Sequence, residues 1–246
     1  MKKALFVLFS VVCVASLASA SDDFSYTATA DPNLAPDGID QNSNPVDVWT
    51  LTFTSGVGGT GYGSDFGTVA GLANAWGFYS YPPDGTAGDG GSDDAATTFA
   101  GGALSIGQTV SINFAMSATD PGKEVGLSLL NGSGDAITFG IFGGEPDAGN
   151  PYTGSGYYYS DAGSTYASAG SMGYQYQVPF NIAFTVTGAG TYSAVAGSDT
   201  WNGTFSGSLI GMDVFNHGAG NGSDVGFNNL TVSLNHPFGQ CWQLVA

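Results

Sequence analysis

The sequence predicts an all-β fold in which two antiparallel sheets pack face to face as a β-sandwich or jelly roll. Apolar and polar residues alternate with a period of two along many short segments, as in strands with one buried side. The chain holds 40 glycines, many of them in turn-like stretches between these segments. No segment shows a sustained 3.6-residue apolar stripe, so amphipathic helices are not expected.

The expected strands begin with Val48 to Thr54, where apolar side chains alternate with threonines. A second strand is expected over Gln108 to Ser117, with Val, Ile, Phe and Met on one side. Apolar residues at alternate positions of 125–129 and 137–141 flank the turn Asn131–Gly134, which predicts a hairpin. The C-terminal half predicts five more strands, at 180–186, 192–194, 201–205, 210–214 and 225–234. The last of these is expected to carry a bulge at Asn228-Asn229.

A sandwich is preferred to a closed barrel, the alternative, because the expected inward residues are large and would overfill a small barrel. Apolar residues make up 42% of the chain, which argues against disorder. No fixed-period repeat indicates a propeller or solenoid. The sandwich domain is expected over residues 46–235, after an acidic flexible segment at 21–45 and before a tail at 236–246.

The first 20 residues have the pattern of a secretion signal. Two lysines precede an apolar run that is too short to span a bilayer, and Ala18-Ser19-Ala20 supplies a cleavage site. An uncleaved anchor is the alternative. Cleavage would leave Cys241 as the sole cysteine, either a free thiol or a partner in an intermolecular disulfide. The predicted location is extracellular, with an attachment to the cell surface left open and no membrane insertion after cleavage.

Charge excludes two classes of partner. The net charge is −17, and Lys123 is the only basic residue after position 20. Such a chain offers no positive patch to phosphates, so nucleic acid is excluded as a partner and an anionic membrane surface would repel it. Most of the acids are interpreted as solvated surface.

Five short segments follow one another as in a group of exported bacterial β-sandwich proteins: 75–79, 101–109, 125–134, 184–192 and 224–230. The chain resembles this group, whose members often carry a PEP-CTERM surface-sorting tail. The resemblance implies a sandwich similar to the concanavalin-like lectin and glucanase fold, together with export. The chain departs from the group at Asn235 to Ala246, which lacks a Pro-Glu-Pro motif and a basic end. Release is therefore expected rather than surface sorting.

Catalytic motifs are scarce. Glycoside hydrolysis needs two carboxyl groups flanking one bond, and the two glutamates, Glu124 and Glu145, do not form the Glu-x-Asp-x-x-Glu pattern of laminarinase-like sandwiches. His217 and His236 lie in turn-rich contexts without a Gly-x-Ser-x-Gly elbow. Two histidines and a terminal cysteine are a poor zinc set. The sequence therefore predicts no enzyme.

Calcium is a candidate ligand for acidic segments, since it prefers oxygen ligands on adaptable loops. Asp84, Asp89, Asp93 and Asp94 crowd a Gly-rich stretch that is expected to be a loop. A second acidic run at 31–47 lacks the Gly and the bidentate Glu of a calcium loop. Solvated acidic loops are the competing interpretation.

A tyrosine cluster is the main candidate for a binding surface. Seven of the twelve tyrosines fall in one stretch rich in Gly, Ser, Asn and Asp: Tyr152, Tyr157, Tyr158, Tyr159, Tyr166, Tyr174 and Tyr176. Tyrosine gives broad amphipathic contact and stacks on the C–H faces of sugars. Because three successive residues of a strand cannot all point inward, at least one ring of Tyr157–Tyr159 is expected to be exposed. Packing of the rings on a sheet edge is an equally good explanation.

These observations predict an exported, non-catalytic module that binds a glycan or another extracellular polymer. One alternative is a structural matrix protein that self-associates through sheet edges and the Tyr-rich segment. A weaker alternative is a glycoside hydrolase-like sandwich. No cofactor is expected apart from the candidate Ca²⁺.

Overall fold

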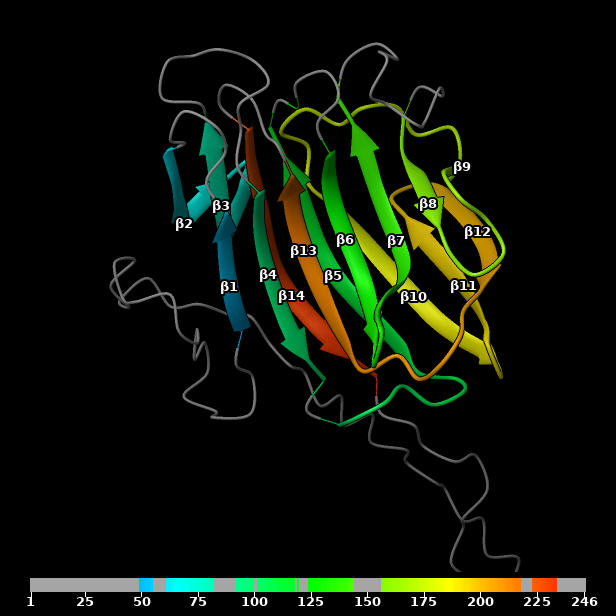
Figure 1. Cartoon of the computed structure of the whole chain (residues 1–246). Coiled ribbons are helices and arrows are strands. Elements are labelled where there is room, and N and C mark those ends of the chain that lie inside the picture. The colour runs from blue at the N-terminus through cyan, green and yellow to red at the C-terminus, as the bar shows by residue number, and fades with distance from the viewer. Residues whose placement is uncertain are drawn as a thin grey trace, which may run out of the picture.

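The computed structural model describes residues 49–54, 61–81, 92–99, 101–117, 119, 124–143, 156–217 and 223–233. The regular elements in these ranges are all β-strands, and all strand pairs are antiparallel. Within the described ranges there is accordingly no helix suited to cross a membrane. The strands form two layers (Figure 1). The predicted all-β, two-sheet sandwich is confirmed.

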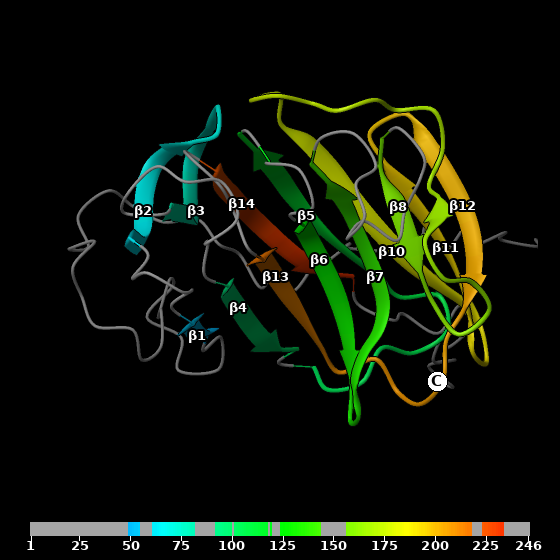
Figure 2. The ribbon, with the colours of Figure 1, turned by 45° about the horizontal axis from the view of Figure 1, so that its top comes forward.

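Each layer is a seven-stranded sheet. Sheet A, the front layer in Figure 1, runs in the order β1 (Trp49–Thr54), β4 (Ser92–Thr98), β13 (Gly211–His217), β6 (Glu124–Asn131), β7 (Gly134–Phe142), β8 (Tyr158–Ser160) and β9 (Ala167–Ser168). Sheet B runs in the order β12 (Asp199–Thr204), β11 (Thr191–Ala196), β10 (Phe180–Gly188), β5 (Thr109–Met116), β14 (Ser223–Val232), β3 (Leu72–Tyr81) and β2 (Gly61–Val69). Figure 2 shows β6, β7 and β13 crossing over β5, β10 and β14.

The core lies between the sheets and follows the period-two pattern. On β5, Val110, Ile112 and Phe114 are fully buried, and on β6 of the other sheet Leu127 and Leu129 are fully buried as well. Burying such a side chain contributes about 1.5–3 kcal/mol to the free energy of folding. With no Lys or Arg among the described residues, this apolar interior rather than ion pairing holds the sheets together.

An aromatic stack closes the core beneath β8. The ring of Phe139 is nearly parallel to the rings of Tyr157 and Trp201, with centroids 5.0 and 5.4 Å away. Tyr159 stacks on the same Trp201 at 5.6 Å. The contact between Tyr159 and Trp201 of β12 holds the short strand β8 against sheet B, although β8 pairs with β7 over only three residues.

The expected strands are found at β1, β5, β6, β7 and β10–β14. The bulge is confirmed, because the register of β14 against β5 shifts between Asn228 and Thr231 and Asn229 has a φ of 53°. Strands β2, β3, β4, β8 and β9 were not predicted. In β4 the inward residues include Ala95 and Thr97, which give little apolar signal. The prediction of a loop around Asp93 and Asp94 is therefore wrong, since both residues lie in β4.

Replacing Tyr192 by phenylalanine is expected to destabilise the fold by about 1–2 kcal/mol. The buried Tyr192 hydroxyl accepts a hydrogen bond from Trp201 Nε1 at 3.3 Å and donates one to Asp161 Oδ2 at 3.0 Å. The variant leaves the buried indole N–H without this acceptor. Urea unfolding measures the effect. Tyr176→Phe, at a 54% exposed side chain, is the matched control, and equal stability of the two variants would contradict the prediction.

Candidate active site

The outer face of sheet A carries polar and aromatic side chains in rows that cross the strands. The first row is His217 on β13, Glu124 on β6 and Phe142 on β7. The second row runs Asp94, Phe215, Gly126, Gly140, Tyr158, and the third runs Ala96, Asp213, Ser128, Thr138, Ser160. Directly opposite residues of antiparallel strands have Cβ atoms about 4.5–5.5 Å apart. We call this set the outer-face site.

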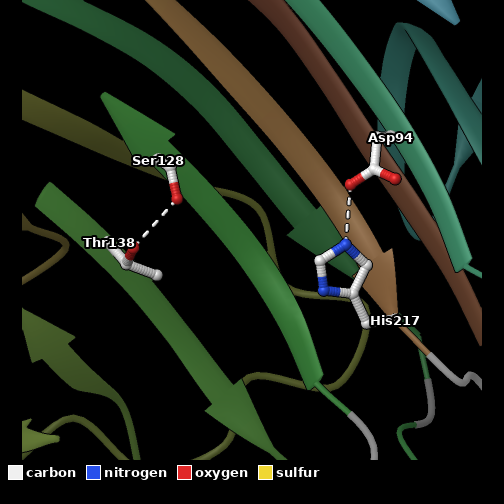
Figure 3. Close-up of polar contacts among 4 residues, drawn as sticks. All are labelled: Asp94, Ser128, Thr138 and His217. Atoms are coloured by element: carbon white, nitrogen blue, oxygen red, sulfur yellow. Dashed lines mark hydrogen bonds and ion pairs between the residues drawn. The ribbon is translucent and has the colours of Figure 1, made fainter. Parts of the chain in front are cut away.

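An imidazole–carboxylate pair lies at one end of the site. His217 Nε2 is 2.6 Å from Asp94 Oδ1 (Figure 3), and the two side chains are 40% and 28% exposed, so solvent reaches them. The His217 ring also stacks on Phe215, with centroids 4.6 Å apart. Asp94 thus engages the Nε2 atom of the ring and not the Nδ1 atom.

The charges around His217 favour its protonated form. Burial alone would lower the pKa of His217, but the hydrogen bond and charge of Asp94, together with Glu124 and Asp213, raise it above its usual value near 6.5. The imidazolium is therefore a cation surrounded by acids. Opposite it, burial raises the pKa of Glu124 to about 6, in spite of the opposing charge of His217.

Two further acids on this face hold their protons more strongly than usual. Burial, and then the charges of Asp94 and Asp135, raise the pKa of Asp213 to about 8. Its Oδ1 is buried without a hydrogen-bond partner. Burial also raises the pKa of Asp135. Shifted acids beside a histidine on an accessible face are typical of catalytic sites.

Two glycines let aromatic rings lie against the sheet. A Cβ at Gly126 would stand 2.8 Å from Cζ of Phe215, and a Cβ at Gly140 would stand 3.0 Å from the hydroxyl of Tyr158. Tyr158 in turn stacks on Phe142 and meets Tyr166 edge-on, with centroids 5.2 and 5.0 Å apart. The rings of Phe142, Tyr158 and Tyr166 thus form an aromatic border beside Glu124.

A cavity of about 200 Å³ opens at the other end of the third row, lined by Asp135, Ala136, Thr138, Ser160, Asp161, Ala162 and Ser206. Next to it, Thr138 and Ser128 share a hydrogen bond of 2.9 Å between their hydroxyl oxygens (Figure 3). Hydroxyl and carboxyl groups of this kind match the donors and acceptors of a sugar. The cavity is therefore a candidate pocket for one sugar unit.

The structure divides the predicted tyrosine cluster into three groups. Tyr157 and Tyr159 point into the core, while Tyr158 belongs to the outer-face site and Tyr166 packs beside it on Tyr158 and Phe142. Tyr174 and Tyr176 are 44% and 54% exposed on a segment beside the end of β5. Tyr152 lies outside the described residues. The prediction that at least one ring of Tyr157–Tyr159 is exposed is wrong, because Tyr157 and Tyr158 are buried and Tyr159 is half-buried.

The predicted calcium residues do not converge where they are described. Asp93 points into the core and Asp94 points outward to His217, since successive strand residues face opposite sides. Asp84 and Asp89 lie outside the described residues. The described ranges hold no group of three or more His, Cys, Asp or Glu side chains suited to a metal ion. Calcium binding by the acidic segments stays a prediction.

The sequence analysis did not include Glu124 or His217 in a site. A pair of acids on a single strand is visible in the sequence, whereas this site takes one or two residues from each of several strands. A partial signal was present: Ser128 and Asp213 occupy outward positions of two expected strands, whereas Glu124 and His217 lie just beyond the expected ends of those strands. What the sequence lacked was the pairing of β6 with β13, which are about 80 residues apart along the chain.

Comparison with known proteins gives the fold. No protein-family model matches the chain, and no curated protein sequence matches it. Among solved structures it is similar to an alginate lyase from Corynebacterium sp., with 16% identity, a TM-score of 0.50 and coverage of 81% of this chain and 99% of that one. An alginate lyase from Alteromonas sp. 272 is 10% identical, with a TM-score of 0.40 and coverage of 74% of this chain and 93% of that one. The exoplasmic/lumenal domain of VIP36, in its Ca²⁺/Man3GlcNAc-bound form, is 10% identical, with a TM-score of 0.39 and coverage of 71% of this chain and 85% of that one. The concanavalin-like resemblance is thus confirmed for the fold.

These similarities correct one expectation. The prediction that the chain is not an enzyme is wrong, because the sandwich that it shares with the Corynebacterium protein is the fold of a polysaccharide-cleaving enzyme. The prediction rested on the absence of a local catalytic motif, while the histidine and the shifted acids come together only in the folded sheet.

Proposed function

We propose that the outer-face site binds an uncharged polysaccharide and hydrolyses its glycosidic bonds by acid–base catalysis. The main observation that supports this proposal is the solvent-accessible His217–Asp94 pair, in which His217 lies opposite Glu124 on one face of sheet A. Export remains part of the proposal, since the signal-like residues 1–20 lie outside the described residues. Carbohydrate-binding and carbohydrate-cleaving proteins with this fold support the sugar class.

The shifted pKa values assign the two roles. Near neutral pH, Glu124 is largely ionised because its pKa is about 6, while the raised pKa of His217 favours its protonated form. Glu124 accepts a proton from a water molecule as the water oxygen attacks the anomeric carbon. His217 gives its Nδ1 proton to the departing sugar oxygen as the C–O bond breaks. One water is consumed and the two proton transfers balance.

Asp94 acts through His217. Its hydrogen bond to Nε2 fixes the ring orientation and stabilises the imidazolium. Phe142 and Tyr166 border the same end of the site and offer flat surfaces to the C–H faces of a sugar. Asp213, protonated near neutral pH because its pKa is about 8, is a hydrogen-bond donor for a sugar hydroxyl.

Charge selects the substrate class. The described residues contain no Lys or Arg, so His217 is the one side chain among them that can face a carboxylate with positive charge. A polyanion would meet the carboxylates of Asp94 and Glu124 on the same face. At 4 Å and an effective dielectric of 20, two like charges repel by about 4 kcal/mol. An uncharged polysaccharide avoids this cost.

Elimination is a second candidate reaction, which the alginate lyase fold favours. It would remove a proton next to a uronate carboxyl group and leave an unsaturated sugar. Glu124 and His217 could supply the same base and acid, but the uronate would need its charge neutralised at the site. The acidic face makes this reaction second to hydrolysis.

The test is a polysaccharide panel at pH 6.5. Soluble glucans, mannan, xylan and galactan are incubated with the protein beside alginate, and new reducing ends and the ultraviolet absorbance of unsaturated sugars are measured. We expect reducing ends from an uncharged polymer without unsaturated products. Glu124→Gln is expected to slow this reaction by about 10²–10⁴-fold.

Asp199→Asn provides the matched control, because it makes the same acid-to-amide change on β12 of the other sheet. It should cleave like the unmodified protein. Absence of cleavage across the panel, or full activity of Glu124→Gln, would overturn hydrolysis at this site. Unsaturated products from alginate would replace it with elimination.

A further inference from the structure

The outer face of sheet B carries an ordered array of uncharged polar side chains. Its rows follow the register of β14, β5, β10, β11 and β12. The first row is Ser233, Thr109, Thr185, Ser193 and Asn202; the second is Thr231, Ser111, Ala183, Val195 and Thr200; the third is Asn228, Asn113 and Asn181. We call these three rows the hydroxyl–amide face.

Hydrogen bonds between neighbouring strands fix many of these side chains. Thr109 and Thr185 share a hydrogen bond of 2.7 Å, and Ser111 and Thr231 share one of 2.8 Å. In the third row Asn181 donates to Asn113 at 3.2 Å, and Asn113 donates to Asn228 at 3.0 Å. Side chains that are already ordered lose little conformational entropy when a ligand binds.

The face is open to solvent on its β10–β12 side. Asn181, Val195, Thr200 and Asn202 are exposed, and the Val195 side chain is 43% exposed. The three rows contain no Asp, Glu, Lys, Arg or His, in a chain with a net charge of −17. A charged ligand would find no partner here, whereas an uncharged one with many hydroxyl groups would find both donors and acceptors.

The spacing of the array is periodic. Neighbouring strands lie about 4.8 Å apart, and side chains on the same face of a strand repeat every ~6.7 Å. A polymer of identical units can form the same contact repeatedly along such a lattice. From this regular, ordered and uncharged surface we propose that the hydroxyl–amide face is a second carbohydrate site, which holds the protein on an insoluble, uncharged polysaccharide. Only the class of polymer rests on the proposed function.

The two faces would act on different forms of the polymer. The outer-face site lies on sheet A, and the hydroxyl–amide face lies on the opposite side of the sandwich (Figures 1 and 2). Binding through sheet B leaves the outer face of sheet A turned away from the anchoring surface. The protein would then be retained on a solid and would act on chains that extend from it.

The experiment measures sedimentation with microcrystalline cellulose, chitin, insoluble β-1,3-glucan and insoluble mannan. We expect retention on at least one of them, and Val195→Glu and Thr200→Glu should each lower the bound fraction at least about tenfold. The matched control is Val178→Glu, which adds the same charge at a 51% exposed valine outside the array and should bind as the unmodified protein does. Thermal unfolding checks that all three variants fold.

The outcomes separate the two sites. His217→Gln should remain on the solid while losing hydrolysis of soluble chains, and the two array variants should keep that hydrolysis. If both array variants sediment like the unmodified protein, or if it is not retained on any of the four solids, the assignment is overturned. A dimer that Val195→Glu dissociates, without retention on a solid, would identify the face as a contact between two copies instead.

Discussion

Replacing His217 by glutamine is expected to lower the hydrolysis rate of the uncharged substrate by about 10²–10⁴-fold. Glutamine keeps a polar side chain that can still reach Asp94, but it cannot carry a transferable proton. His217 is the residue proposed to give a proton to the leaving sugar. The described residues contain no Lys, no Arg and no second His that could replace it as a cationic proton donor. The loss should therefore appear in kcat, with little change in KM.

The pH dependence separates a proton-transfer role from a merely structural one. The unmodified protein should give a bell-shaped profile of kcat/KM. Its rising limb should lie near pH 6, where Glu124 ionises. Its falling limb should lie above the usual histidine value of 6.5, because the acidic neighbours raise the pKa of His217. Because the two groups interact, the observed values belong to the pair.

His217→Gln should remove the falling limb from the residual activity, and Glu124→Gln should remove the rising limb. Asp94→Asn is the intermediate case. It keeps a hydrogen-bond acceptor for Nε2 but loses the charge, so the falling limb should move to lower pH. A profile of His217→Gln with both limbs unchanged would show that another group donates the proton.

Period-two alternation predicted the strands whose inward residues are large. Phe114 and Leu127 are fully buried, as the pattern required. The same rule failed at β4, because its inward side chains are Asp93, Ala95 and Thr97. Such a strand is stable because β1 and β13 pair with it on either side, and that pairing joins segments far apart in the chain.

The candidate site was less predictable than the fold. The tyrosine cluster drew attention through local density, yet Tyr157 belongs to the core and Tyr174 to a separate surface segment. By contrast, His217 and Glu124 are 93 positions apart in the sequence and lie opposite each other in the sheet. Local composition cannot show such a contact, because it depends on strand order. Shifted pKa values depend on it as well, since burial and neighbouring charges set them.

Asp93 gives the second large effect, on stability. It is fully buried in the core, and neither carboxylate oxygen has a hydrogen-bond partner. Burial, and then the charge of Asp94, raise the pKa of Asp93 from 3.8 to about 7. The folded protein therefore binds this proton more tightly than the unfolded chain does. The resulting stabilisation is fully present below pH 3.8 and is lost as the pH rises to about 7.

Glu124 and Asp213 have pKa values raised in the same direction, to about 6 and about 8. The pKa of His217 is also raised, so its contribution likewise falls as the pH rises through its folded value. All four groups therefore predict that the protein is more stable at pH 4.5 than at pH 8. One pKa unit corresponds to about 1.4 kcal/mol, so Asp93 alone accounts for at most roughly 4 kcal/mol of this difference.

Asp93→Asn isolates the share of this carboxyl group, because the amide has nearly the same shape and never ionises. The variant should match the unmodified protein at pH 4.5 and exceed it by roughly 2–4 kcal/mol at pH 8, as measured by urea unfolding at both values. Asp94→Asn, one residue along and partly exposed, should give a smaller gain, because it removes only the repulsion that Asp94 adds to Asp93. If Asp93→Asn is less stable at pH 8, then the ionised carboxylate is stabilised in the core and the predicted rise of its pKa is wrong.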